Sequence, residues 1–152
     1  MKMKVFACVA VVVGMTGAAL ADSTAPGEVQ FVDGAVAASL TNLGGDAAAG
    51  RNWFADRKLG NCLACHVNSD RSDQSFHGEV GPSLDGVGSR WSEAELRGIV
   101  ANAKVTFEDT IMPAFYRDSG YTRTLKKFDG KTILSAQQVE DVVAYLLTLK
   151  ED

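Results

Sequence analysis

Two cysteines and a histidine lie close together near the middle of this chain. Cys62 and Cys65 are three positions apart, and His66 follows directly. Two thiols at this spacing can add to the two vinyl groups of a haem, and the histidine is then held beneath the iron. A neutral imidazole nitrogen is a good ligand for that iron. The pattern therefore predicts one covalently attached haem c, a carrier of one electron.

Three other interpretations compete for the same residues. The cysteine pair could form a plain disulfide, or a thioredoxin-like redox pair, although no βαβ pattern surrounds it. It could also be half of a zinc site that His66 and His77 complete. Zinc prefers four ligands in a tetrahedron, however, and the adjacent Cys65 and His66 point poorly toward one centre. Haem attachment accounts for both thiols, the histidine and the N-terminal segment together.

Residues 1–21 are typical of a secretory signal peptide. Two lysines precede an uncharged, mostly apolar run from Val5 to Leu20, which ends in the small-residue cleavage site Ala19-Leu20-Ala21. A permanent membrane anchor is the alternative, but the run is short for a spanning helix. We therefore expect export to the periplasm, with no stable membrane insertion once this segment has been removed.

Cleavage after residue 21 would simplify the inventory of reactive side chains. Of the three cysteines, Cys62 and Cys65 would stay, and Met112 would be the one methionine left of four. The net charge of −4 would become more negative, because two lysines are lost and no acidic residue is. An acidic surface argues against nucleic acid and anionic membranes as partners and favours a basic or neutral partner face.

A low-spin electron carrier needs a second axial ligand, since an open position on the iron would bind small molecules instead. Met112 is the main candidate, because Pro113 disfavours helix at Met112 and suits a loop that presents the thioether to the haem. Such a ligand raises the reduction potential relative to two histidines. The other interpretations are that Met112 fills a gap in the core, that His77 or a lysine is the ligand, or that there is none.

Three further residues are candidates for contacts around the haem. The carbonyl of Pro82 could accept a hydrogen bond from the other ring nitrogen of His66 and so fix its tautomer. Arg90 and Trp91 carry donors that could meet the haem propionates. Each also has a plain structural interpretation: a turn proline, a charge flanking a helix and a packed indole.

The sequence predicts a small all-α domain over 45–152 that uses the haem as much of its core. Capping residues and apolar spacing of the helical period indicate three helices, over 46–58, over 93–103 and a last one that opens at the capping box 135–138 and carries an apolar stripe to Leu149 or Lys150. Residues 67–80 form a polar loop, 104–134 lack a clean period, and no run is a convincing strand. The extension 22–44 either wraps the domain or meets a partner, or is a loosely ordered leader.

These motifs resemble those of the class I cytochromes c. The matching features are Gly50-x-x-x-Phe54, Cys62-x-x-Cys65-His66, Gly81-Pro82-x-Leu84, Met112-Pro113 and Tyr145-Leu146. The resemblance implies a fold in which the first and last helices cross near a small residue and an aromatic one. Gly50 and Tyr145 would take those two places.

Longer stretches are similar to the SoxX family of mono-haem cytochromes, from about Asp33 to the C-terminus. The resemblance assigns Cys62 and Cys65 to haem attachment, and His66 and Met112 to the iron. It implies a SoxA cytochrome as partner in a SoxAX enzyme, an L-cysteine S-thiosulfotransferase that joins thiosulfate to a cysteine of the carrier SoxYZ. The sulfur chemistry would occur at the SoxA haem, and this chain would pass electrons to a soluble cytochrome c.

Two other functions are open on the sequence. The chain could be a free periplasmic electron carrier, although its long extension counts against that role. It could instead be a haem enzyme or a gas sensor with an open iron site, which requires that Met112 is not bound. The mature chain would hold no free thiol for a persulfide and shows no base–nucleophile pair, so we expect no catalytic site of its own.

Overall fold

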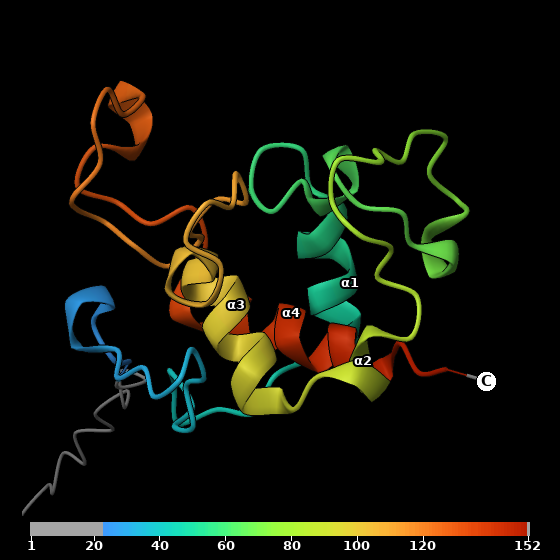
Figure 1. Ribbon diagram of the computed structural model, residues 1–152, viewed down its shortest axis with the longest axis horizontal. Helices are drawn as coiled ribbons and strands as arrows, with labels where there is room; N and C mark the ends of the chain where they lie inside the picture. Colours follow the sequence, from blue (N-terminus) through green and yellow to red (C-terminus); the bar gives the residue numbers. More distant parts are fainter. Residues whose placement is uncertain (1–22, 152) are drawn as a thin grey trace, which may run out of the picture.

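The computed structural model describes residues 23–151, and within them the chain is built from helices and loops (Figure 1). Its α-helices are α1 (Ala47–Ala55), α2 (Val87–Arg90), α3 (Glu93–Thr106) and α4 (Ala136–Thr148). Single 3-10 turns are η1 (Pro26–Glu28), η2 (Cys62–Ala64), η3 (Ser69–Arg71) and η4 (Lys126–Phe128). Over these residues β-structure is limited to two isolated bridges, which confirms the all-α prediction.

The proposed signal peptide falls on residues 1–21, outside the part of the chain that the structure describes. Among residues 23–151, no helix combines the length and the apolar character needed to cross a bilayer.

Capping side chains set the starts of the three longer helices, as predicted. The Asp46 carboxylate accepts hydrogen bonds from the first free amides of α1, and Ser92 with Glu95 forms a capping box at the start of α3. Ser135 and Gln138 form a second capping box at the start of α4. These side chains satisfy amides that a helix cannot bond internally, so each start is fixed locally.

The helix ends differ from the prediction. The first helix stops at Ala55 rather than at residue 58, because Asp56 is extended and its carboxylate accepts a hydrogen bond from the Lys58 amide. The next long helix continues to Thr106 rather than ending at 103, and it passes through a kink at the non-helical Asn102. The four-residue α2 was not expected.

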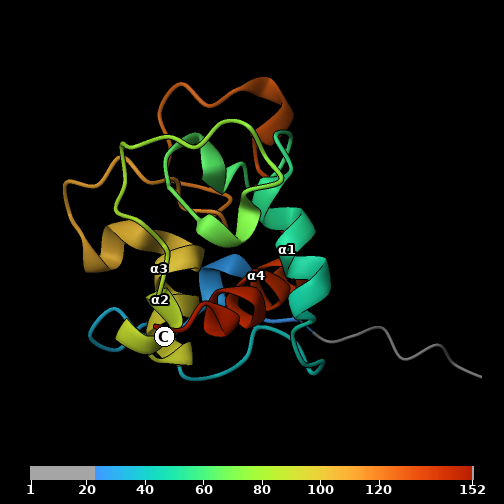
Figure 2. The ribbon, with the colours of Figure 1, turned by 90° about the vertical axis from the view of Figure 1, so that its right-hand side faces the viewer.

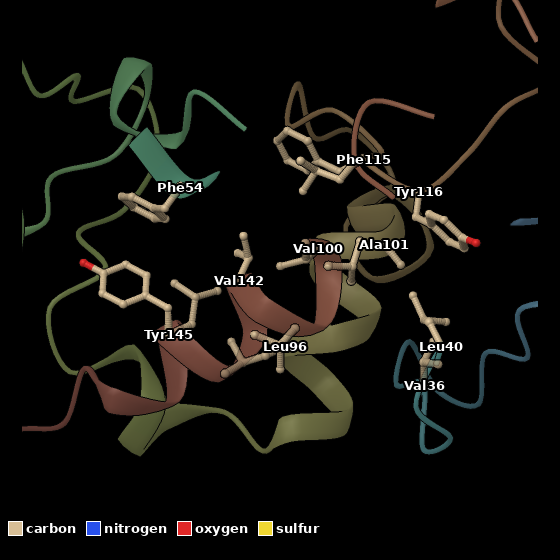
Figure 3. Close-up of a cluster of buried hydrophobic side chains, with 14 of the residues drawn as sticks. Val36, Leu40, Phe54, Leu96, Val100, Ala101, Phe115, Tyr116, Val142 and Tyr145 are labelled. Atoms are coloured by element: carbon tan, nitrogen blue, oxygen red, sulfur yellow. The ribbon is translucent and has the colours of Figure 1, made fainter. Parts of the chain in front are cut away.

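Helices α1 and α4 cross at very short range. A Cβ on Gly50 would lie 1.9 Å from the carbonyl oxygen of Asp141, so only glycine lets the two backbones meet there. The Asp141 carboxylate accepts hydrogen bonds from the Asp46 amide and the Trp53 indole, at 2.9 and 3.1 Å. One turn farther along, Phe54 and Tyr145 meet edge to face with ring centroids 5.3 Å apart (Figure 3). The crossing implied by the family resemblance is thus present.

The segment 23–44 packs against the helices rather than hanging free. Val36 and Leu40 are buried and belong to the same hydrophobic core as α3 and α4 (Figure 3). The Leu40 carbonyl accepts from the Thr24 amide, and the Thr24 carbonyl accepts from the Tyr116 hydroxyl at 2.7 Å. Of the two interpretations of this extension, the structure shows the one in which it wraps the domain.

A buried ion pair joins this segment to two helices. Arg97 of α3 and Glu140 of α4 have side chains that are 3% and 4% exposed, with the Nε and Oε1 atoms 2.9 Å apart. Arg97 also donates to the Val36 carbonyl, and Glu140 accepts from the Leu40 amide. Burial alone would lower the pKa of Arg97, but its bonds to Glu140 raise that pKa above the ordinary value.

We expect Glu140→Gln to destabilise the fold by about 3 kcal/mol, because it leaves the buried Arg97 guanidinium without its main counter-charge. Chemical denaturation of the purified protein measures this loss. The matched control is Glu93→Gln, which removes the exposed partner of the same guanidinium, and exposed pairs contribute little. Equal losses in the two variants would show that burial does not set the strength of this pair.

Candidate haem-binding site

The cysteine–histidine motif lies on a tight turn that follows α1. The amides of Cys65 and His66 both donate to the Cys62 carbonyl, at 3.1 and 3.0 Å. The two thiols are free and make no disulfide. Burial raises the pKa of the Cys62 thiol to about 12, whereas the attacking thiol of a redox pair has a lowered pKa. These two observations count against the disulfide and the thioredoxin-like interpretations.

One ring nitrogen of His66 is held by the backbone. Its Nδ1 atom lies 2.7 Å from the carbonyl oxygen of Pro82, which can only accept, so Nδ1 carries the proton. That tautomer leaves the lone pair on Nε2 for a metal, the arrangement usual for an iron-bound histidine. The contact expected between Pro82 and His66 is therefore present.

The absence of a side chain at Gly81 leaves the space that the His66 imidazole occupies. A Cβ on Gly81 would lie 2.3 Å from Cε1 of His66 and under 3 Å from both ring nitrogens. The Gly81 amide donates to the Cys65 carbonyl, and the Gly78 amide donates to the Leu63 carbonyl, each at 2.8 Å. The return loop 78–82 thus packs directly on the motif. Two thiols, an oriented imidazole and a backbone cradle fit a haem c.

The polar loop after the motif is more ordered than its composition predicts. Nδ1 of His77 accepts from the Asn68 amide at 3.3 Å, and Nε2 donates to the Arg71 carbonyl at 3.0 Å. Both ring nitrogens of His77 are therefore used within the loop, which counts against the proposal that it binds iron or zinc. Across residues 23–151 there is no cluster of three or more His, Cys, Asp or Glu side chains that could hold a metal ion.

A polar network ties this loop to both crossing helices. The Tyr145 hydroxyl of α4 donates to the Asp70 carboxylate at 2.7 Å and accepts from the side-chain amide nitrogen of the fully buried Asn68 at 2.9 Å. Arg51 of α1 pairs with Asp70 at 2.8 Å. The bonds from Tyr145 and Arg51 lower the pKa of Asp70, so the carboxylate stays charged at neutral pH.

Met112 lies in the segment that follows α3, half-buried against the hydrophobic core. The ammonium group of Lys104 donates to the Thr110 and Met112 carbonyls at 2.8 and 3.2 Å, and the Phe115 amide donates to the Val100 carbonyl. These bonds hold the Met112 loop against the end of α3. In both ribbon views the green segment that carries the cysteine motif and the yellow-orange segment after α3 lie above α4 (Figure 2).

Arg90 and Trp91 make contacts within the protein. The two terminal nitrogens of Arg90 donate to the Asp85 and Ser83 carbonyls, at 2.6 and 3.0 Å. The Trp91 indole meets the Phe107 ring edge to face, with centroids 6.2 Å apart. A contact of either residue with haem propionates stays a prediction.

Sequence reasoning missed Asn68, the contact of Gly81 with the His66 ring and the role of the Tyr145 hydroxyl. Gly81 was noted only as part of the motif Gly81-Pro82-x-Leu84, and a buried asparagine inside a polar run gives no local signal. Each of them acts on a residue far along the chain, and no pattern of period or spacing records such a contact.

A family model described as cytochrome c matches residues 47–150. A solved structure entitled "Crystal structure of SoxXA from P. pantotrophus" contains a chain with 53% sequence identity and a TM-score of 0.80; the match covers 85% of this chain and 99% of that one. The c-type cytochrome SorU from Sinorhizobium meliloti matches at 26% identity and a TM-score of 0.45, and the match covers 68% of this chain and 90% of that one. The comparison with curated protein sequences found no match.

Cytochrome c-550 from Paracoccus versutus matches at 23% identity and a TM-score of 0.39, covering 70% of this chain and 99% of that one. TM-scores as low as those of SorU and cytochrome c-550 establish no common arrangement of the whole fold. The SoxXA chain, in contrast, combines 53% identity with a TM-score of 0.80.

We expect Gly81→Ala to displace the His66 ring and to destabilise the protein by about 2 kcal/mol, because the new methyl group overlaps the imidazole. The haem absorption spectrum and chemical denaturation would show the two effects. Gly27→Ala is the control, since a Cβ there meets nothing within 4 Å. An unchanged spectrum and stability for Gly81→Ala would contradict the backbone cradle described above.

Proposed function

This chain belongs to the cytochrome c family and, within it, to the SoxX cytochromes, and we propose that it serves as the electron-transfer subunit of a SoxXA-type complex. The observation that carries this proposal is the 53% identity to a chain of the SoxXA structure over 99% of that chain. The complete Cys62-Leu63-Ala64-Cys65-His66 motif and the cradle for its histidine support one covalent haem c.

Different residues of this chain would attach the haem c and bind its iron. A bound haem c supplies one-electron chemistry at its iron. Cys62 and Cys65 would attach it covalently. His66, fixed by Pro82, would offer Nε2 to the iron, and Met112 would offer its thioether as the second ligand. The packed loops around the motif would exclude water and stabilise one ligand geometry.

The thiosulfotransferase activity is assigned by this proposal to the complex rather than to the chain alone. With Cys62 and Cys65 attached to haem and Cys8 removed with the signal peptide, the exported chain would have no thiol that could carry sulfur. The SoxA subunit would therefore couple thiosulfate to a cysteine of SoxYZ in the periplasm. The electrons released would reach this chain and leave it for a soluble cytochrome c.

A free electron carrier is the second candidate, and one structural observation removes the argument against it. The extension 22–44 was the sequence feature that counted against a free carrier, because such a segment suits a stable partner. In the structure the described residues 23–44 pack against the domain of the same chain. Val36 and Leu40 lie in its core, and their backbones bond to the Arg97–Glu140 pair. That segment therefore no longer separates the two functions.

Native mass spectrometry of the protein, purified gently from periplasm that also contains SoxA, separates these functions. We expect one haem on this chain and a second haem protein bound to it. A lone monomer with one haem would favour the free carrier. The absence of haem mass would overturn the cytochrome assignment itself.

We expect Met112→Ala to leave the haem iron without its second protein ligand, so that the reduced protein binds carbon monoxide without acid or denaturant. The absorption spectrum of the reduced protein with and without carbon monoxide measures this. Ile111→Ala is the matched control, because the neighbouring Ile111 side chain points to solvent and is 77% exposed. Carbon monoxide binding by the unmodified protein would reject Met112 as a ligand and favour the open-site enzyme or sensor.

A further inference from the structure

A strongly basic surface stands out on this acidic chain. Residues 117–131, here called the basic lobe, form an excursion between the Met112 loop and α4. The basic lobe carries five of the fifteen lysines and arginines of the chain, against two acidic residues, Asp118 and Asp129. Its cations are Arg117, Arg123, Lys126, Lys127 and Lys131. The lobe has a net charge of +3, whereas the whole chain has a net charge of −4, so the remaining residues taken together are acidic.

The cations of the basic lobe are not neutralised by the protein's own carboxylates. Elsewhere in the described residues, arginines pair with acidic side chains, and the pairs are Arg51–Asp70, Arg71–Asp73, Arg90–Glu151 and Arg97–Glu140. Within residues 23–151 no ion pair involves the lobe. Arg117 bonds to the Ser119 and Gly120 carbonyls, and the Lys127 ammonium lies 4.5 Å from the centre of the Phe128 ring. The positive charge of the basic lobe is thus available to an acidic partner.

The fold pins the basic lobe next to the Met112 loop. The Tyr121 hydroxyl donates to the Ala114 carbonyl at 3.0 Å, and the Ile133 and Leu134 amides both donate to the Phe115 carbonyl at 3.0 Å. Both ends of the lobe are therefore fixed within three residues of Met112. In both ribbon views the lobe, drawn in orange, projects on the side of α4 that also carries the cysteine motif (Figures 1 and 2).

We propose that the basic lobe is the docking surface for the acidic face of a transient electron-transfer partner, the protein that collects the electron from this chain. The proposal rests on the proposed function only in that the electron leaves from a haem. Lysines are depleted in the cores of stable interfaces but suit salt-sensitive, charge-steered encounters. A net negative chain with one positive lobe would also orient an acidic partner before contact.

This proposal differs from the expectation, drawn from the net charge, that an acidic chain favours a basic or neutral partner face. The net charge averages over the surface and hides the separation of charge between the lobe and the remainder. An anionic membrane fits the lobe less well than a protein does. The lobe has no long amphipathic helix, since η4 spans three residues, and Leu125, 66% exposed, is its one large aliphatic side chain.

The test compares two variants that lower the net charge by two. Lys126→Gln with Lys127→Gln removes charge from the lobe. Ala37→Glu with Ala38→Glu adds negative charge at exposed positions in the segment 36–44, which lies at the opposite end of the molecule from the lobe in both ribbon views. A change that follows from net charge alone would be the same in both variants.

The kinetic measurement is stopped-flow oxidation of the reduced haem protein by hexacyanoferrate(III), an anion, and by tris(phenanthroline)cobalt(III), a cation. At low ionic strength we expect the lobe variant to react about threefold more slowly with the anion and faster with the cation, an effect that salt removes. The control variant should change much less. Equal changes of the oxidation rate in both variants would overturn the proposal that electrons leave the haem beside the basic lobe.

A binding measurement does not depend on electron transfer. Poly-L-glutamate is added to the reduced protein, and chemical shifts are followed by NMR. We expect shifts confined to 117–131 and lost in the lobe variant. Shifts centred elsewhere, or binding to phosphatidylglycerol vesicles through the lobe with no response to poly-L-glutamate, would overturn the proposal.

Co-purification with SoxA separates this proposal from the proposed function. The lobe variant should keep any SoxA subunit that the unmodified chain retains, because the lobe serves a transient partner. Loss of SoxA from that variant would place the lobe in the stable interface and overturn the inference. A chain that never binds SoxA would refute the proposed complex and leave the lobe measurements valid.

Discussion

The close contact of α1 with α4 is the constraint on which the rest of the structure depends. At Gly50 the two backbones meet with no room for a side chain, and the Asp141 carboxylate bonds to two groups of α1. A contact at this range fixes the angle and the register of both helices, because neither can slide without a clash or an unpaired buried carboxylate. The edge-to-face pair of Phe54 and Tyr145 continues the same contact.

The crossing of α1 and α4 determines the geometry of the candidate haem site. The cysteine motif follows α1 after only a short turn, so the position of α1 determines where both thiols lie. Tyr145 of α4 then binds Asp70 and Asn68 in the loop that follows the motif. With that loop anchored, the return segment places Gly81 and the Pro82 carbonyl against His66. Nδ1 is thereby hydrogen-bonded to Pro82, which leaves the lone pair of Nε2 available to a metal.

The sequence already specified the features that depend on neighbouring residues. Capping boxes at Ser92 and Ser135 mark helix starts because their partners lie three residues away. The apolar stripe of the last helix identifies its buried face for the same local reason. The thiols, the histidine and their spacing indicate haem chemistry before any fold is known. Helix ends were predicted less well, since a side chain such as Asp56 can compete for amides at the end of a helix.

Only the tertiary structure decided what depends on contacts between distant residues. It packed the N-terminal segment into the core through Arg97 and Glu140, where the sequence left a wrap and a loose leader equally open. It occupied both nitrogens of His77 within one loop, and it anchored the basic lobe beside the Met112 loop with no ion pair to its cations among the described residues. Composition sums charge over the whole chain, and spacing records neighbours along it. Which groups meet across the fold is determined by packing, because the same local pattern is compatible with many arrangements in space.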